Sequence, residues 1–103
     1  MNALIREQLP QIIEICKRHR VRRLALFGSA LRDDFDPARS DLDLLIDFEP
    51  LEEGTHADHY FGLIEELEDR LGRPVDVVES HMLRNKYVRL SVEQNHVVLY
   101  DAA

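Results

Sequence analysis

The sequence predicts an α/β protein of α+β type, in which a small mixed β-sheet is flanked by helices. Three observations lead to this prediction. Apolar residues recur at helical spacing in several segments, short runs typical of strands alternate with those segments, and glycine or proline stands at the boundaries between them. The chain has 103 residues, the size of one domain, so we expect a single domain over residues 1–103.

The first forty residues predict a helix, a strand and a short helical turn. Apolar residues at helical spacing predict an opening helix that ends near His19, with Pro10 in the first turn of its main part. An apolar run over residues 23–27 predicts a buried strand, and Gly28-Ser29 directly after it predicts a sharp turn. Residues 30–40 predict a brief helical turn followed by a polar loop.

The rest of the chain predicts three more strands and two more helices. Residues 41–48 alternate in polarity, which predicts a strand with one apolar face made by Leu42, Leu44, Ile46 and Phe48. Thr55 and Asp58 resemble a capping box and predict the start of a helix that stops at Gly72. We expect the apolar face of this helix to carry Phe61, Leu63, Ile64, Leu67 and Leu71. The later patterns predict a strand, a helix and a closing strand at residues 75–79, 81–93 and 97–100.

Charge and cysteine content narrow the classes of function. Acidic residues number 20 against 13 basic ones, a net charge of −7, which argues against direct binding of nucleic acid because phosphate contacts need clustered Lys and Arg. Residues 17–23 are a basic exception, interpreted as a solvated helix end, with an RNA or acidic-protein contact as the alternative. Cys16 is the one cysteine, and no long apolar run or signal peptide is present, so we expect a cytoplasmic protein without a membrane segment.

The most informative pattern is Gly28-Ser29, eleven further residues, and then Asp41-Leu42-Asp43. Aspartates at positions i and i+2 of a strand point the same way, roughly 6.5 Å apart along the strand. Two such carboxylates repel each other unless a cation lies between them. Oxygen ligands suit Mg²⁺, and the metal pairs of phosphoryl-transfer sites lie roughly 3.5–4 Å apart. The pattern therefore predicts a magnesium site.

A third carboxylate, Asp76, interrupts the apolar run of residues 74–78. Val75 and Val77 share one face, so Asp76 points the other way, and an aspartate in a buried strand is costly without a partner. If its strand lies beside that of Asp41 and Asp43, the three carboxylates meet. They would then hold two metal ions and leave Asp76 to take a proton from an attacking hydroxyl. The alternative is that all three are solvated residues at strand ends.

The first part of the same pattern, Gly28-Ser29, predicts a phosphate-binding turn. The backbone N–H groups of Gly28-Ser29 can point at a phosphate, and glycine permits its close approach. Arg32, one helical turn on, can neutralise the same triphosphate.

These motifs resemble the minimal nucleotidyltransferases of the polymerase-β-like superfamily, often called MNT domains. The resemblance covers nearly the whole chain and rests on Gly28-Ser29, Asp41-Leu42-Asp43 and Asp76. It implies the polymerase-β-like nucleotidyltransferase fold, ATP as substrate and two Mg²⁺ ions. It also implies that Asp41, Asp43 and Asp76 hold the metal and carry catalysis. The phosphates would be bound by Gly28, Ser29, Arg32 and Ser40.

Members of this size are typically antitoxins encoded beside a HEPN-domain ribonuclease toxin. The resemblance implies that the chain transfers AMP from ATP to a hydroxyl of that toxin, and a tyrosine is the expected acceptor. Two alternatives stay open: an antitoxin that masks the toxin by contact alone, and a nucleotidyltransferase that acts on a small molecule. We expect a hetero-oligomer with the toxin, with a homodimer as a further option because a small open sheet leaves its edges available for pairing.

Overall fold

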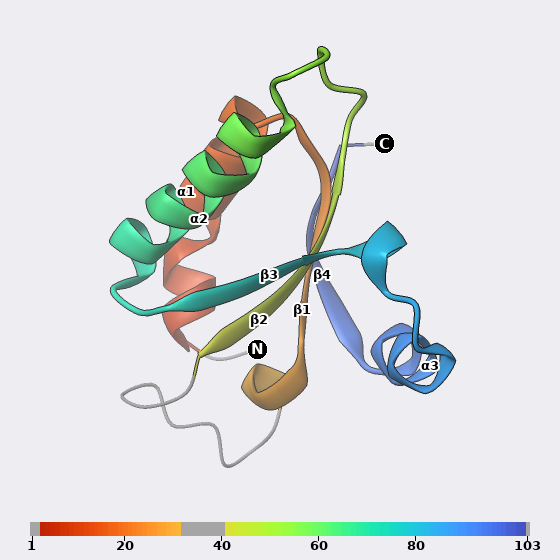
Figure 1. The fold of residues 1–103 in the computed structure, drawn as a ribbon. Coiled ribbons are helices and arrows are strands. Elements are labelled where there is room, and N and C mark those ends of the chain that lie inside the picture. The colour runs from red at the N-terminus through yellow and green to blue at the C-terminus, as the bar shows by residue number, and fades with distance from the viewer. Residues whose placement is uncertain (1–2, 32–40, 103) are drawn as a thin grey trace.

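The computed structural model describes residues 3–31 and 41–102, except for the side chains of residues 29 and 30. Its elements follow one another in the predicted order of alternating helices and strands (Figure 1). They are α1 (Ala3–Arg18), β1 (Val21–Phe27), the 3₁₀ helix η1 (Gly28–Leu31), β2 (Leu42–Phe48), α2 (His56–Leu71), β3 (Val75–Glu79), the 3₁₀ helix η2 (Ser80–Met82), α3 (Lys86–Gln94) and β4 (His96–Asp101). The predicted mixed sheet flanked by helices is confirmed.

The four strands form one sheet in the order β3-β2-β1-β4. β1 pairs antiparallel with both β2 and β4, whereas β2 pairs parallel with β3. A parallel pair needs a crossover connection, and α2 supplies it. α1 and α2 lie together on one face of the sheet, and α3 lies on the other side of it (Figure 1).

The main core lies between the sheet and the helices α1 and α2. Its fully buried members include Ile5 and Ile12 of α1, Leu63 and Leu67 of α2, and Leu24 of β1. On the opposite face of the sheet a smaller apolar cluster lies against α3, built on Ala25, Leu45 and Val92 with Phe27, Val78 and Leu83 beside them. One face of the sheet is therefore covered by two helices, and the other only in part by one short helix.

Pro10 lies inside α1, which begins seven residues earlier at Ala3, so its predicted place in a first turn is wrong. Proline has no N–H to donate to the carbonyl of Arg6 four residues before it. The helix nevertheless continues, because Ile5 and Ile12, on either side of the proline, are both buried in the main core.

Two details of α2 also differ from prediction. Thr55 is the N-cap residue, but its hydroxyl donates to the carbonyl oxygen of Glu52 at 2.7 Å and makes no cap hydrogen bond, so no capping box forms. Phe61 is 66% exposed, because it lies two residues before Leu63 and two residues turn a helix by more than half a circle. The predicted stop at Gly72 is confirmed, with that glycine in the left-handed conformation at φ 66°.

The segment predicted as one helix over residues 81–93 is two shorter pieces. η2 ends at Met82, and α3 begins only at Lys86. Asn85 caps α3, since its side-chain oxygen accepts hydrogen bonds from the backbone N–H groups of Tyr87 at 2.9 Å and Val88 at 3.2 Å. A polar side chain that satisfies these two N–H groups starts a helix there.

Candidate active site

Asp43 and Asp76 lie side by side on the less covered face of the sheet. They are register partners in the parallel pair of β2 and β3, which places them on neighbouring strands roughly 4.8 Å apart. Because Leu42, Leu44, Val75 and Val77 are buried in the main core, the side chains between them point to the opposite face. The predicted meeting of the second and third aspartates therefore occurs in the fold.

Asp41 immediately precedes β2, which begins at Leu42. It is exposed, as is Asp76, whereas Asp43 between them is half-buried. The sequence predicts Asp76 within a buried strand, but the structure leaves this carboxylate in contact with solvent. The reason is that α1 and α2 cover only the other face of β3, so Asp76 does not bear the cost of an unpaired buried charge.

The turn after β1 lies directly against Asp43. Phe27 at the end of β1 is the register partner of Asp43. Gly28 follows with φ +73°, a conformation that favours glycine, and a Cβ atom built on it would overlap the carboxylate of Asp43. The same Cβ atom would lie 3.1 Å from Cγ of Asp43. Glycine is therefore required here both by the backbone conformation and by the close approach of the aspartate.

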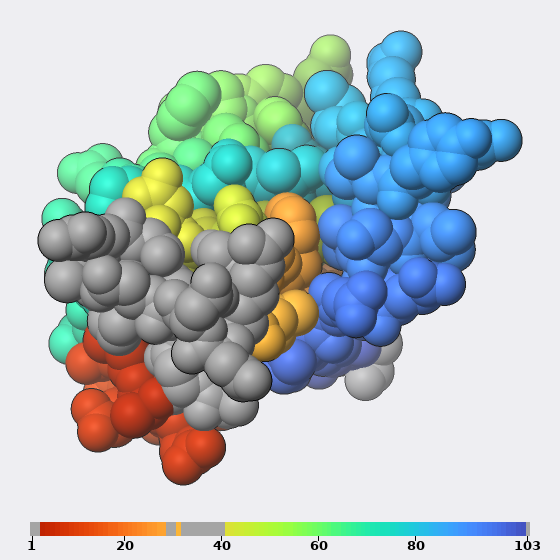
Figure 2. Space-filling model, turned by 90° about the horizontal axis from the view of Figure 1, so that it is seen from below, coloured from red at the N-terminus to blue at the C-terminus, as the bar shows by residue number. Residues whose placement is uncertain are grey.

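Other residues predicted to bind the nucleotide are placed only in part. Ser29 lies in η1, next to Gly28. Arg32 and Ser40 lie outside the described residues. Viewed from below, the start of β2 in yellow, β3 in teal and η1 in orange share one face of the molecule, with α3 in blue beside η1 (Figure 2).

The aspartates are oxygen donors of the kind that Mg²⁺ prefers. No group of three His, Cys, Asp or Glu side chains within residues 3–31 and 41–102 lies close enough together to hold a metal ion. Mg²⁺ is, however, commonly bound by only one or two carboxylates together with substrate phosphates. The neighbouring carboxylates of Asp43 and Asp76, with the backbone of Gly28 close against Asp43, fit that mode of binding.

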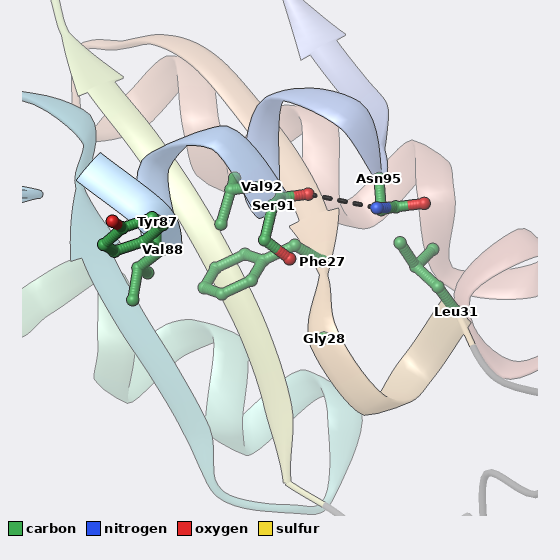
Figure 3. Close-up of a pocket in the computed structure, with 8 residues that line it drawn as sticks. All are labelled: Phe27, Gly28, Leu31, Tyr87, Val88, Ser91, Val92 and Asn95. Carbon is green, nitrogen blue, oxygen red and sulfur yellow. Dashed lines mark hydrogen bonds between the residues drawn. The ribbon is translucent and has the colours of Figure 1, made fainter. Parts of the chain in front are cut away.

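A pocket of about 610 Å³ adjoins this site, between the end of β1 with η1 on one side and α3 on the other (Figure 3). No motif in the sequence indicates this pocket. The available signal was that α3 carries apolar and small polar residues at helical spacing, but only the tertiary structure brings that face to the end of β1. The pocket is lined by Phe27, Gly28, Leu31, Tyr87, Val88, Ser91, Val92 and Asn95.

A second polar cluster lies at the far end of β3. Glu79 Oε2 is 2.8 Å from Nε2 of His56, and Glu79 Oε1 is 3.2 Å from Nε2 of His81. Burial acts to raise the pKa of Glu79, but the hydrogen bonds from the two histidines outweigh it and the pKa is lowered. Nearby, the Tyr60 hydroxyl donates to the carbonyl oxygen of Val77 at 2.6 Å. Its pKa is raised, first by burial and then by the charges of Glu79 and Asp76.

The basic segment, residues 17–23, lies at the opposite end of β1 from Gly28. Two of its members have acidic neighbours: Arg18 lies 2.9 Å from Glu66, and Arg20 lies 4.0 Å from Glu49. The interpretation as a helix end applies to Lys17 and Arg18, the last residues of α1, whereas residues 21–23 belong to β1.

Comparison with known proteins gives a consistent result. A family model described as a nucleotidyltransferase domain matches residues 9–99 of the chain. The candidate protein adenylyltransferase MJ1379 of Methanocaldococcus jannaschii is 33% identical over 95 residues, which cover 84% of this chain and 93% of that protein. A solved structure of a candidate minimal nucleotidyltransferase is 32% identical in sequence to this chain and superposes with a TM-score of 0.73. The match covers 90% of this chain and 90% of that one. Another, of a toxin–antitoxin with AMP-PNP, shares the fold at 18% identity and a TM-score of 0.66, covering 90% of this chain and 73% of that chain.

The chain therefore belongs to the nucleotidyltransferase domain family. More particularly, it is a nucleotidyltransferase of the minimal type with the polymerase-β-like fold, as the resemblance of Gly28-Ser29 and Asp41-Leu42-Asp43 implies. None of the helices in residues 3–31 and 41–102 is long and apolar enough to cross a lipid bilayer.

Proposed function

We propose that this chain is the antitoxin of a toxin–antitoxin pair and transfers AMP from ATP to a hydroxyl of its partner, a HEPN-domain ribonuclease toxin. A tyrosine is the proposed acceptor, and its modification silences the ribonuclease. The most direct support is the placement of three residues: Gly28 lies against Asp43, and Asp43 is the register partner of Asp76. This placement brings a turn suited to phosphate binding beside two neighbouring carboxylates. The similarity to candidate protein adenylyltransferases supports a protein as acceptor.

In the proposed reaction, the acceptor oxygen attacks the α-phosphorus of ATP and forms a new phosphorus–oxygen bond. The bond between the α-phosphorus and the bridging oxygen of the β-phosphate breaks, and pyrophosphate leaves with its electron pair. Asp76 accepts the proton of the hydroxyl and passes it to solvent, for which its exposed carboxylate is well placed. The products are AMP-protein and pyrophosphate.

The remaining site residues hold the nucleotide. Asp41, Asp43 and Asp76 are proposed to bind two Mg²⁺ ions, with Gly28, Ser29, Arg32 and Ser40 on the phosphates. When bound, Mg²⁺ supplies the positive charge that the triphosphate and the transition state require. The missing side chain of Gly28 permits the close approach of Asp43, and the backbone N–H groups of this turn are proposed to contact the phosphate oxygens.

A partner protein is needed to present the acceptor. Within the described part of the chain, the aspartates lie on a sheet face covered only by the short helix α3, which leaves room for a docked protein. A solved toxin–antitoxin shares this fold, which supports a hetero-oligomer with a toxin. We place the reaction in the cytoplasm, where ATP is available and a lone cysteine stays reduced.

Intact-mass spectrometry tests the proposal. The HEPN-domain protein encoded beside this chain is incubated with it, ATP and Mg²⁺, and the mass of both proteins is measured. We expect the partner to gain one or more AMP units, to gain none with Asp43→Asn, and to gain them normally with Asp69→Asn. Asp69 is a matched control because it is an exposed aspartate on α2, the helix that covers the face of the sheet opposite to Asp43 and Asp76 (Figure 1).

Other outcomes identify the alternatives. If the partner gains no mass but binds the chain and loses its ribonuclease activity, the chain neutralises the toxin by contact alone. If ATP is consumed only when a small hydroxyl compound is added, the acceptor is a small molecule. Either result overturns protein adenylylation as the function.

A further inference from the structure

We propose that the pocket between η1 and α3 binds the nucleobase of the nucleotide substrate, with the base lying between Phe27 and the face of α3 that carries Val88 and Ser91. This inference deepens the proposed function and rests on its nucleotide site. It assigns a binding role to α3, a helix with no part in the motifs found in the sequence.

The position of the pocket links it to the phosphate site. Gly28 belongs both to the pocket lining and to the turn that touches Asp43. Phe27, also in the lining, is the register partner of Asp43 and lies on the same face of the sheet. A nucleotide whose α-phosphate lies at Asp43 therefore has the pocket directly beside it, on the β1 side.

The order of the strands decides whether the acceptor or the nucleotide lies beside the pocket. Asp76 lies on β3, Asp43 lies on β2, and Gly28 directly follows the end of β1, the next strand of the sheet. Attacking and leaving oxygens lie roughly in line across the transferred phosphorus. The nucleoside is joined to the α-phosphorus through its 5′-oxygen, which is neither the attacking nor the leaving oxygen. The acceptor hydroxyl approaches from the side of Asp76, which takes its proton, so the pocket beside Gly28 lies away from the acceptor and is available to the nucleoside.

The lining has the chemistry that a nucleobase requires. All eight lining residues are uncharged, which suits a neutral ring and does not suit a triphosphate. The walls are aromatic or aliphatic, and a volume of about 610 Å³ is typical of a small-molecule site. Tyr87 is 73% exposed and Val88 is 45% exposed at the pocket, so a bound base would cover apolar surface that now faces water.

Two polar side chains supply hydrogen-bonding groups for the edge of the ring. In Figure 3 the hydroxyl of Ser91 points toward Phe27, and Asn95 lies one helical turn further along. Nδ2 of Asn95 donates to the carbonyl oxygen of Ser91 at 3.3 Å. A nucleobase carries several donors and acceptors on its edge and matches this pair, whereas the phenol of a tyrosine has only one polar atom.

The test compares ATP with inorganic tripolyphosphate, which has the phosphates but no base. The affinities of both are measured by isothermal titration calorimetry with Mg²⁺, on wild type and on Ser91→Leu, which narrows the pocket and removes the hydroxyl. We expect Ser91→Leu to lower the affinity for ATP at least tenfold and the affinity for tripolyphosphate less than twofold. Tyr87→Ala removes an aromatic ring from the pocket lining, and we expect it to weaken the binding of ATP about tenfold and that of tripolyphosphate less than twofold. Gln94→Leu is the matched control, since Gln94 is an exposed polar residue of α3 outside the lining.

Several results would overturn the inference. It is wrong if wild type binds ATP no more tightly than tripolyphosphate, or if Ser91→Leu weakens both equally or neither. It is also wrong if Ser91→Leu leaves ATP affinity unchanged but abolishes transfer, because the pocket then holds the acceptor. Circular dichroism checks that each variant is folded. Since the readout is binding, base recognition is measured even if no AMP is transferred to a protein, which separates this inference from the proposed function.

Discussion

Replacing Gly28 by alanine tests the close contact at the centre of the site. Two effects are expected to add. A non-glycine residue in the left-handed region costs roughly 1–2 kcal/mol, of which about 0.4–1 kcal/mol is offset because alanine restricts the unfolded chain. The new Cβ atom would also overlap the carboxylate of Asp43 and lie 3.2 Å from its Cβ atom, and relieving such overpacking costs about 1–3 kcal/mol. We therefore expect Gly28→Ala to lower the free energy of unfolding by about 2–3 kcal/mol.

Gly54 provides the control. It has a similar backbone conformation, at φ +82°, but a Cβ atom there would meet nothing within 4 Å. Gly54→Ala should lower the free energy of unfolding by only the backbone contribution, about 0.5–1 kcal/mol. Urea unfolding followed by circular dichroism measures both variants.

Catalysis supplies a second readout of the same contact. Displacing Asp43 by about 1 Å is expected to reduce AMP transfer on the order of a hundredfold in Gly28→Ala and not in Gly54→Ala. The intact-mass assay followed over time gives the rate. If both alanine variants lose the same stability and keep full transfer, the contact with Asp43 has no energetic or catalytic role and the reasoning fails.

Three further predictions concern other parts of the fold. Asn85→Ala should lower the free energy of unfolding by about 1 kcal/mol in urea, and Thr55→Ala should lower it clearly less. The reason is that only Asn85 accepts hydrogen bonds from the helix it caps. Equal losses in the two variants would contradict this. Because the pKa of Glu79 is lowered in the folded state, its contribution to stability is present above the ordinary value of 4.5 and is lost as the pH falls through the lowered pKa. The stability of Glu79→Gln should accordingly fall less than that of wild type between pH 5 and about pH 3, and parallel acid-unfolding curves would exclude this role. Cys16 is buried, and burial raises the pKa of its thiol to about 12. A thiol reagent at neutral pH should therefore modify Cys16 in urea but not in the native protein. Rapid modification of the native protein would show that the thiol is accessible.

Local patterns predicted most elements because the causes of those elements are local. The alternation over residues 41–48 led to β2 and to the correct buried face, and Gly72 marked the end of α2. The two differences have different origins. The pattern around Pro10 predicts a helix start, but tertiary burial of α1 on both sides of the proline carries the helix through it. The cap at Asn85 is local, and it separates η2 from α3 where the spacing of apolar residues predicts one helix.

The sequence by itself determined the types of residue at the site and their direction. Aspartates two apart on a strand face the same way, and an aspartate between two buried valines faces away from the core, whatever the rest of the chain does. Only the tertiary structure decided that Asp43 and Asp76 are register partners, that Gly28 touches Asp43, and that α3 closes a pocket beside them. Those relations join segments distant in the sequence. They depend on strand order, register and helix packing, which follow from burying one common core and not from any short stretch of residues.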